Sequence, residues 1–80
     1  MGERHTEEMR LLGLTIAFYR RARGLTQSEL AEAVQISRTH MSNIEAPNTK
    51  TSISLNLLFD IAEALDIPVK ELFDFQGRSL

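Results

Sequence analysis

Hydrophobic residues recur every three or four positions along most of the chain, and short polar stretches interrupt this pattern. Leu12, Ile16 and Tyr19 fall on one face of a helix that we predict at residues 6–23. Gly24 follows this helix, and glycine adopts the left-handed conformation of a helix C-cap without steric cost. No segment shows the alternation of a convincing strand, so the periodicity predicts an all-α fold.

Two shorter helices are predicted next, each opening at a residue type that caps helix N-termini. Thr26 and Glu29 have the spacing of a capping box, which indicates a second helix from Thr26 to about residues 34–35. Ser37 is a favourable N-cap for a third helix, which we expect to end near Glu45. The inward faces of these two helices carry Leu30, Ala31, Val34, Met41 and Ile44.

The C-terminal part of the chain predicts two more helices. A fourth, over about residues 54–65, has a wide apolar stripe of Leu55, Leu58, Phe59, Ala62 and Leu65. Pro68 suits the first turn of a short fifth helix, whose inward residues are Val69, Leu72 and Phe73. Phe75 at the edge packs either on the core or on a second subunit. We therefore predict a compact five-helix bundle in one domain, 1–80, with a core at about 12–75 between flexible tails.

Composition narrows the function classes. The chain has 80 residues, of which 42% are hydrophobic, as in an ordinary globular domain. It has no cysteine, and its two histidines, His5 and His40, are too far apart in sequence to suggest a metal site, so we expect no metal and no cofactor. No apolar run approaches the roughly 18 residues of a membrane span, and we expect a cytoplasmic protein without a membrane partner.

The charge is uneven along the chain. The net charge of −2 argues against a broadly basic nucleic-acid binder. Residues 10–50, however, hold six basic and three acidic side chains, whereas residues 51–80 hold two basic and five acidic ones. One face of the folded chain could therefore be basic and its far end acidic.

The second and third predicted helices have the features of a helix-turn-helix at roughly 27–44. A tight turn at 34–36 separates them, and Ala31 is small enough for the two helices to approach closely. The third helix turns outward a polar face made of Arg38, Thr39, His40, Ser42 and Asn43. The second helix of such a motif enters the major groove of DNA, which is about 12 Å wide and admits one helix.

Longer strings of residues strengthen this interpretation. Arg20-x-x-x-Gly-Leu-Thr-Gln-x-x-Leu-Ala31 is followed by Ile36-Ser-Arg-x-x-Met-Ser-x-Ile-Glu45, by Leu55-x-x-Leu-Phe-x-Ile-Ala-x-x-Leu65 and by Leu72-Phe73. Over about residues 16–73 the chain resembles the Cro/repressor-type, or XRE, helix-turn-helix family. This resemblance implies the fold of a lambda-repressor-like DNA-binding domain.

The resemblance also implies roles for single residues. Gln27 matches a position that contacts a DNA phosphate, and the positions of Arg38, Thr39 and Asn43 face base edges. Arginine prefers guanine and asparagine prefers adenine in such contacts. Arg20 and Glu45 match a salt bridge between the first helix and the end of the third. The full set of expected DNA-contacting residues is Gln27, Ser37, Arg38, Thr39, His40, Ser42, Asn43 and Lys50, with His40 and Ser42 nearer the backbone and groove edge.

The chain departs from the family pattern in three places. Gln35 stands in the turn where the family usually has glycine, so either a non-glycine residue takes a positive φ or the turn differs. Ala46-Pro47 replaces the usual Asn-Gly, and Pro47 has no N–H for a phosphate contact. The loop over 46–54 is about two residues longer than usual, and Lys50 is the candidate for the lost contact.

These observations predict a sequence-specific regulator of transcription that binds double-stranded DNA. We expect a repressor that binds an inverted-repeat operator as a homodimer through the helix at about 37–45, with the fourth and fifth helices at the dimer surface. The alternative is a protein-interaction module, or an antitoxin that neutralises a partner protein. The sequence does not choose among a phage regulator, a restriction-modification controller and an antitoxin.

An ordinary structural or surface role stays open for several residues. Arg21 and Arg23 equally fit an ordinary solvated helix face, and His40 fits a surface residue without a ligand. Met9 and Met41 are expected to fill the core. The carboxylates Asp60, Glu63 and Asp66 lie along one helix as in a solvated face, and no catalytic triad or phosphate-binding glycine loop is present. We therefore expect no enzymatic activity.

Overall fold

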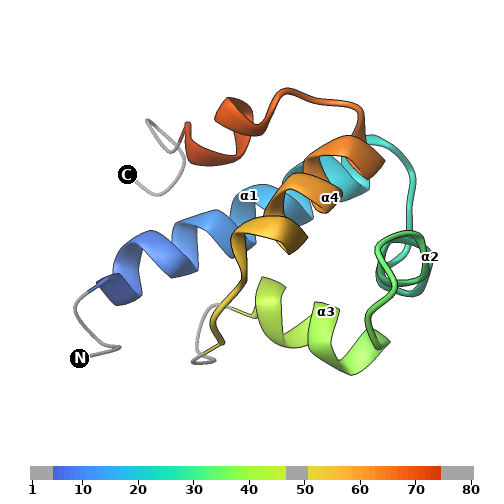
Figure 1. Ribbon diagram of the computed structural model, residues 1–80, viewed down its shortest axis with the longest axis horizontal. Helices are drawn as coiled ribbons and strands as arrows, with labels where there is room; N and C mark the ends of the chain where they lie inside the picture. Colours follow the sequence, from blue (N-terminus) through green and yellow to red (C-terminus); the bar gives the residue numbers. More distant parts are fainter. Residues whose placement is uncertain (1–4, 47–50, 75–80) are drawn as a thin grey trace.

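A computed structural model describes residues 5–46 and 51–74 of the chain (Figure 1). It contains the α-helices α1 (Thr6–Ala22), α2 (Gln27–Ala33), α3 (Arg38–Glu45) and α4 (Leu55–Leu65), followed by the 3₁₀ helix η2 (Val69–Phe73). The described residues form no strand, and the all-α prediction is confirmed. The described residues hold four α-helices where the sequence predicts five helices, because the predicted short fifth helix, in the five residues after Pro68, is the tighter 3₁₀ helix that is common in short segments.

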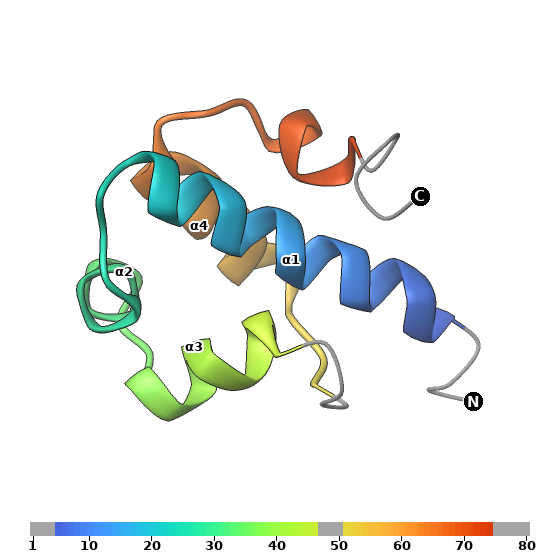
Figure 2. The same cartoon turned by 180° about the vertical axis from the view of Figure 1, so that it is seen from behind.

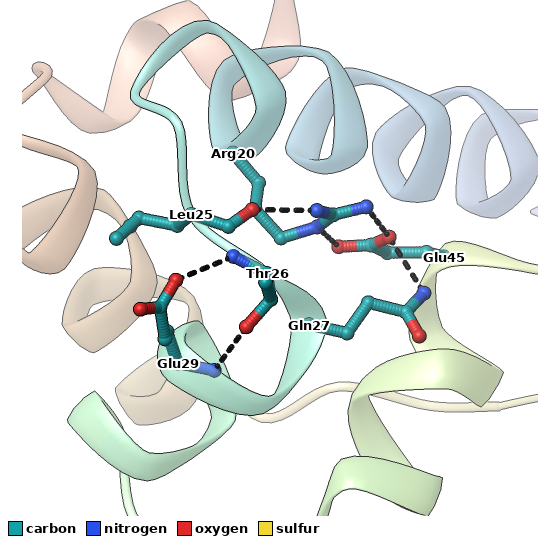
Figure 3. Close-up of polar contacts among 6 residues, drawn as sticks. All are labelled: Arg20, Leu25, Thr26, Gln27, Glu29 and Glu45. Carbon is teal, nitrogen blue, oxygen red and sulfur yellow. Dashed lines mark hydrogen bonds and ion pairs between the residues drawn. The ribbon is translucent and has the colours of Figure 1, made fainter.

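Side-chain caps define the starts of three helices. The Thr26 hydroxyl accepts a hydrogen bond from the Glu29 backbone N–H at 3.0 Å, and the Glu29 carboxylate accepts one from the Thr26 N–H at 2.8 Å (Figure 3). Ser37 caps α3 through the N–H of His40, and Ser54 caps α4 in the same way. Because these bonds satisfy N–H groups that have no partner inside the helix, they hold two very short helices at fixed starting points.

The turns between helices use left-handed backbone conformations. Gly24 has φ +74° at the end of α1, as its residue type predicts. Gln35, in the turn between α2 and α3, has φ +63°, so the non-glycine residue there takes the left-handed conformation. Asp66 has φ +59° after α4. A non-glycine residue in this region costs roughly 1–2 kcal/mol, which the packing of the flanking helices must offset.

The helices enclose one apolar cluster to which each of them contributes. Its most buried large side chains are Ile16, Leu30, Met41, Ile61, Leu65 and Leu72. Ala31 is also buried, as expected for the place where α2 meets its neighbours. These residues fix the faces that α2 and α3 turn inward, and thereby the face that α3 leaves outside.

The predicted inward stripe of α4 is partly wrong. Leu55 is 65% exposed and Phe59 is 50% exposed, whereas Leu57 and Ile61 are buried together with Leu58, Ala62 and Leu65. The physical reason is that a helix at the surface buries only one of its faces. In α4 the face that meets the core runs through residues 57, 58, 61, 62 and 65. Phe73 on η2 is also exposed rather than inward. Phe75 lies outside the described residues.

Arg23 acts as a cap for α4. Its Nε donates to the carbonyl oxygen of Leu65 at 2.7 Å, and its Nη2 donates to that of Asp66 at 3.0 Å. A cation at a helix C-terminus also interacts favourably with the helix dipole. Arg23 therefore ties the end of α1 to the end of α4, which the sequence left open as a plain solvated position.

Two opposite views show how α3 is presented. In Figures 1 and 2, α1 and α4 lie in the middle of the molecule, with η2 on one side and α3 along the opposite edge. The helix α2 lies beside α3 at one end of this edge. One side of α3 therefore packs on the helices above it, and its other side lies at the border of the molecule.

Candidate nucleic-acid interface

The outward face of α3 is polar and free of the core. Arg38, Thr39 and Asn43 are exposed, while Met41 and Ile44 are buried. Because successive residues rotate by about 100° around a helix, the three exposed side chains share a sector of about 140°, opposite the buried ones. None of these three side chains forms a hydrogen bond or ion pair within the described residues.

The remaining predicted contact residues surround this face. Ser37 is exposed, but its hydroxyl accepts the N–H of His40 at 3.0 Å and so caps α3. His40 and Ser42 are half-buried. Lys50 lies outside the described residues, as does Pro47. By helical rotation Ser42 falls in the sector of Arg38, Thr39 and Asn43, whereas His40 falls outside it and Ser37 precedes the first residue of α3.

A buried ion pair fixes the end of α3. The Arg20 Nε and Nη2 donate to the two carboxylate oxygens of Glu45 at 2.8 and 3.0 Å, while Nη1 donates to the Leu25 carbonyl at 2.7 Å (Figure 3). Arg20 is only 8% exposed and Glu45 6%. A bidentate arginine–carboxylate pair is strong and directional. It therefore holds the last residue of α3 against the last turn of α1.

Gln27 joins this cluster. Its Nε2 donates to the Glu45 carboxylate at 3.0 Å, so one carboxylate receives side chains from both α1 and α2 (Figure 3). The resemblance pointed to a phosphate contact for Gln27, and it carried no signal for this bond inside the protein. Only the fold brings residues 27 and 45 together, since they lie 18 positions apart. Among the described residues, no buried side-chain nitrogen or oxygen lacks a hydrogen-bond partner.

The charge near α3 is modest. Arg20 is paired with Glu45, Arg23 is engaged by carbonyl oxygens, and Arg10 pairs with Glu7 at 2.7 Å on the surface. The Arg10 guanidinium, mainly through its hydrogen bonds, lowers the pKa of Glu7. Arg38 is exposed and forms no ion pair within the described residues. The surface therefore offers a few directed polar groups instead of a strong positive field.

Other kinds of site find little support in the described part of the chain. No group of three or more histidine or acidic residues is placed to hold a metal ion there. Asp60, Glu63 and Asp66 are exposed side chains of α4 and of the turn after it. No described helix is long and apolar enough to cross a membrane.

Comparison with known proteins agrees with the geometry. A family model described as helix-turn-helix matches residues 16–72. The HTH-type transcriptional regulator SinR of Bacillus subtilis is 34% identical over 64 residues, which cover 80% of this chain and 57% of the relative. The chain thus spans little more than half the length of this curated relative.

Two solved structures are similar over most of their length. The restriction-modification controller protein C.AhdI from Aeromonas hydrophila has a TM-score of 0.77 and 30% identity, with 84% of this chain and 98% of that chain covered. The biofilm master regulator SinR, solved in complex with DNA, has a TM-score of 0.71 and 35% identity, with 79% and 98% covered.

Proposed function

This chain belongs to the XRE-type helix-turn-helix family of transcriptional regulators, and from this membership we propose that it represses transcription by binding operator DNA through α3. The single observation that carries the proposal is the division of α3 into a buried apolar side and an exposed polar side. A relative solved with DNA supports the same ligand class. With DNA as the proposed ligand, we propose that the protein is cytoplasmic.

Direct contacts to bases are assigned to the three exposed residues of α3. The Arg38 guanidinium suits the O6 and N7 atoms of guanine, and the Asn43 amide suits the N6 and N7 atoms of adenine. Thr39 lies between them on the same sector and can contact either a base or a thymine methyl group. Each well-formed pair discriminates against the wrong base by about 1–3 kcal/mol.

Backbone contacts are assigned to the margins of α3 and to the start of α2. Gln27 uses one hydrogen of its amide for Glu45, and the amide has a second hydrogen for a phosphate oxygen. Ser42 within the exposed sector, His40 beside it and Ser37 at the start of α3 can donate to the DNA backbone. Lys50 is proposed as a further phosphate contact from the sequence alone. Such contacts fix the register of the helix without reading sequence.

Binding of a homodimer to an inverted repeat is consistent with the small number of basic side chains that one copy offers to DNA. One copy has few cations for phosphate, so its non-specific affinity is low. Two copies engage half-sites about 34 Å apart and combine their contacts. Leu55 and Phe59, one turn apart on α4 and at least half exposed, supply an apolar surface for the second copy.

The test is selection of bound sequences from a random duplex pool at fixed salt, with wild type, Arg38→Ala and Arg21→Ala in parallel. Arg21 is an exposed arginine of α1, outside α3, and serves as the matched control. We expect an inverted-repeat consensus that loses definition at one base of each half-site in Arg38→Ala and is unchanged in Arg21→Ala. Failure of the wild type to enrich any sequence at low salt would contradict the proposal.

A second candidate function is the binding of a partner protein, as in an antitoxin. The exposed Leu55 and Phe59 favour it, because apolar side chains at one surface position suit a protein partner as well as a second copy. The exposed face of α3 favours DNA, since it carries arginine, threonine and asparagine and no acidic or large apolar side chain. Sequence selection that fails while a defined partner co-purifies would support this second function.

A further inference from the structure

We propose that Gly13 is a positioning residue, which sets how closely the DNA-reading helix α3 lies against α1. This inference rests on the proposed function and extends it to a residue that does not contact DNA. Gly13 is buried in the middle of α1, two turns before Arg20. It lies where the end of α3 meets α1, next to Ile44 and Glu45.

The contact at Gly13 is made by backbone on both sides. A Cβ at this position would lie well inside van der Waals contact with the carbonyl oxygen of Ile44. It would also lie 3.3 Å from the carbonyl carbon of Ile44 and 3.4 Å from the Cα of Glu45. Because backbone atoms cannot rotate away as a side chain does, an added methyl group requires the two helices to move apart.

Gly13 and Arg20 support the same end of α3. They are seven residues apart on α1, hence on one face and about 10 Å apart along the axis. Arg20 holds Glu45 through a long side chain that can follow a small shift of α3. The contact at Gly13 has no such freedom. Gly13 therefore sets the closest approach of the helices, while the ion pair holds them at that distance.

The consequence for DNA binding follows from the position of Asn43. Asn43 directly precedes Ile44, the residue whose carbonyl group rests on Gly13. A displacement of this end of α3 moves Asn43 relative to the groove, whereas Arg38 lies at the other end of the helix. Base hydrogen bonds have narrow limits of distance and angle, so specific contacts weaken before phosphate attraction does.

The experiment compares Gly13→Ala with Gly24→Ala, which add the same methyl group. Gly24 has φ +74° and no atom within 4 Å of its would-be Cβ, so its substitution strains the backbone without touching α3. The readout is the ratio of affinity for the selected operator to affinity for non-specific duplex at one salt concentration. Partial unfolding lowers both affinities by the same factor, so this ratio reports the geometry of the folded protein.

We expect the ratio to fall about tenfold in Gly13→Ala, the discrimination of roughly one base contact, and to stay within about twofold of wild type in Gly24→Ala. Sequence selection with Gly13→Ala should lose definition at the base read by Asn43 and keep that read by Arg38. An unchanged ratio in Gly13→Ala, or an equal fall in both variants, would overturn the assignment.

Two further outcomes have clear meanings. If Gly13→Ala is unfolded in buffer, the comparison is repeated for all proteins in an osmolyte that favours compact states. A variant that remains unfolded there makes Gly13 a requirement for folding and overturns a positioning role. A wild type that selects no sequence overturns the proposed function itself, whereas a wild type that selects an operator leaves only the role of Gly13 to be decided.

Discussion

At the scale of single residues, the cluster around Glu45 governs the position of α3. Its carboxylate accepts hydrogen bonds from Arg20 on α1 and from Gln27 on α2. A buried ion pair is not by itself a large source of stability, because removing two charges from water is costly. Removing only one partner is different, since it leaves a buried charge without compensation.

Arg20→Met should therefore lower the free energy of unfolding by about 3–5 kcal/mol. The double variant Arg20→Met/Glu45→Leu should recover most of this loss, because neither charge remains buried. Urea denaturation followed by circular dichroism measures both. Arg21→Ala, at an exposed position on the same helix turn, is the control and should change stability by less than about 0.5 kcal/mol. If Arg20→Met lowers the free energy of unfolding by less than about 1 kcal/mol, the buried ion pair does not have the structural role assigned to it.

The sequence carried part of this residue-scale picture. The Arg20–Glu45 pair was expected through the family resemblance, and the structure places the two groups in bidentate contact. The bonds of Gln27 and Arg23 were not expected, because their partners lie 18 and 42 positions away and only the packed fold brings them together. Gly13 left no signal either, since an isolated glycine within a helical pattern does not show what it faces.

At the scale of elements, caps and turns proved the most predictable features. The capping box at Thr26 and the caps at Ser37 and Ser54 lie where local sequence indicates, because capping depends on residues only a few positions apart. The face of α4 was harder to predict. Its sequence is apolar on almost every side, so periodicity alone did not decide between the stripe through Leu55 and Phe59 and the stripe through Leu57 and Ile61.

The turn between α2 and α3 gives a prediction at this scale. Gln35 has φ +63°, and glycine adopts this conformation without the steric penalty of a side chain. Gln35→Gly should raise the free energy of unfolding by about 0.5–1 kcal/mol. This net gain is the backbone strain that glycine relieves, reduced by the larger conformational entropy that glycine has in the unfolded state. Gln35→Ala, which keeps a Cβ, should bring no gain. Thermal melts of the three proteins provide the comparison, and a glycine variant less stable than wild type would refute the explanation.

At the scale of the whole molecule, the two sides of the fold have different chemistry. The exposed face of α3, at one edge of the molecule in Figure 1, is polar, whereas α4 has the exposed apolar side chains Leu55 and Phe59. The sequence predicts the dimer surface in the region of the fourth and fifth helices, and the structure shows which apolar side chains of α4 are exposed.

Phe59→Gln should convert a dimer into a monomer, because it replaces an aromatic side chain of the proposed interface with a polar one. Sedimentation equilibrium should give about twice the chain mass of 9.1 kDa for the wild type and the mass of one chain for the variant. Phe18→Gln is the matched control, since Phe18 is similarly exposed but lies on α1. A monomeric wild type would contradict the proposed dimer, and a dimer that survives Phe59→Gln would place the interface elsewhere.

The division of α3 into two sides also bears on how this protein could acquire new targets. Met41, Ile44 and Glu45 are buried against the other helices, whereas the side chains of Arg38, Thr39 and Asn43 form no hydrogen bond among the described residues. Substitutions at Arg38, Thr39 and Asn43 therefore leave the core, the helix caps and the Arg20–Glu45 ion pair intact. The three positions proposed to contact bases can thus be replaced without disturbing the fold, and a library varied at these codons alone would test whether new target sequences are selected.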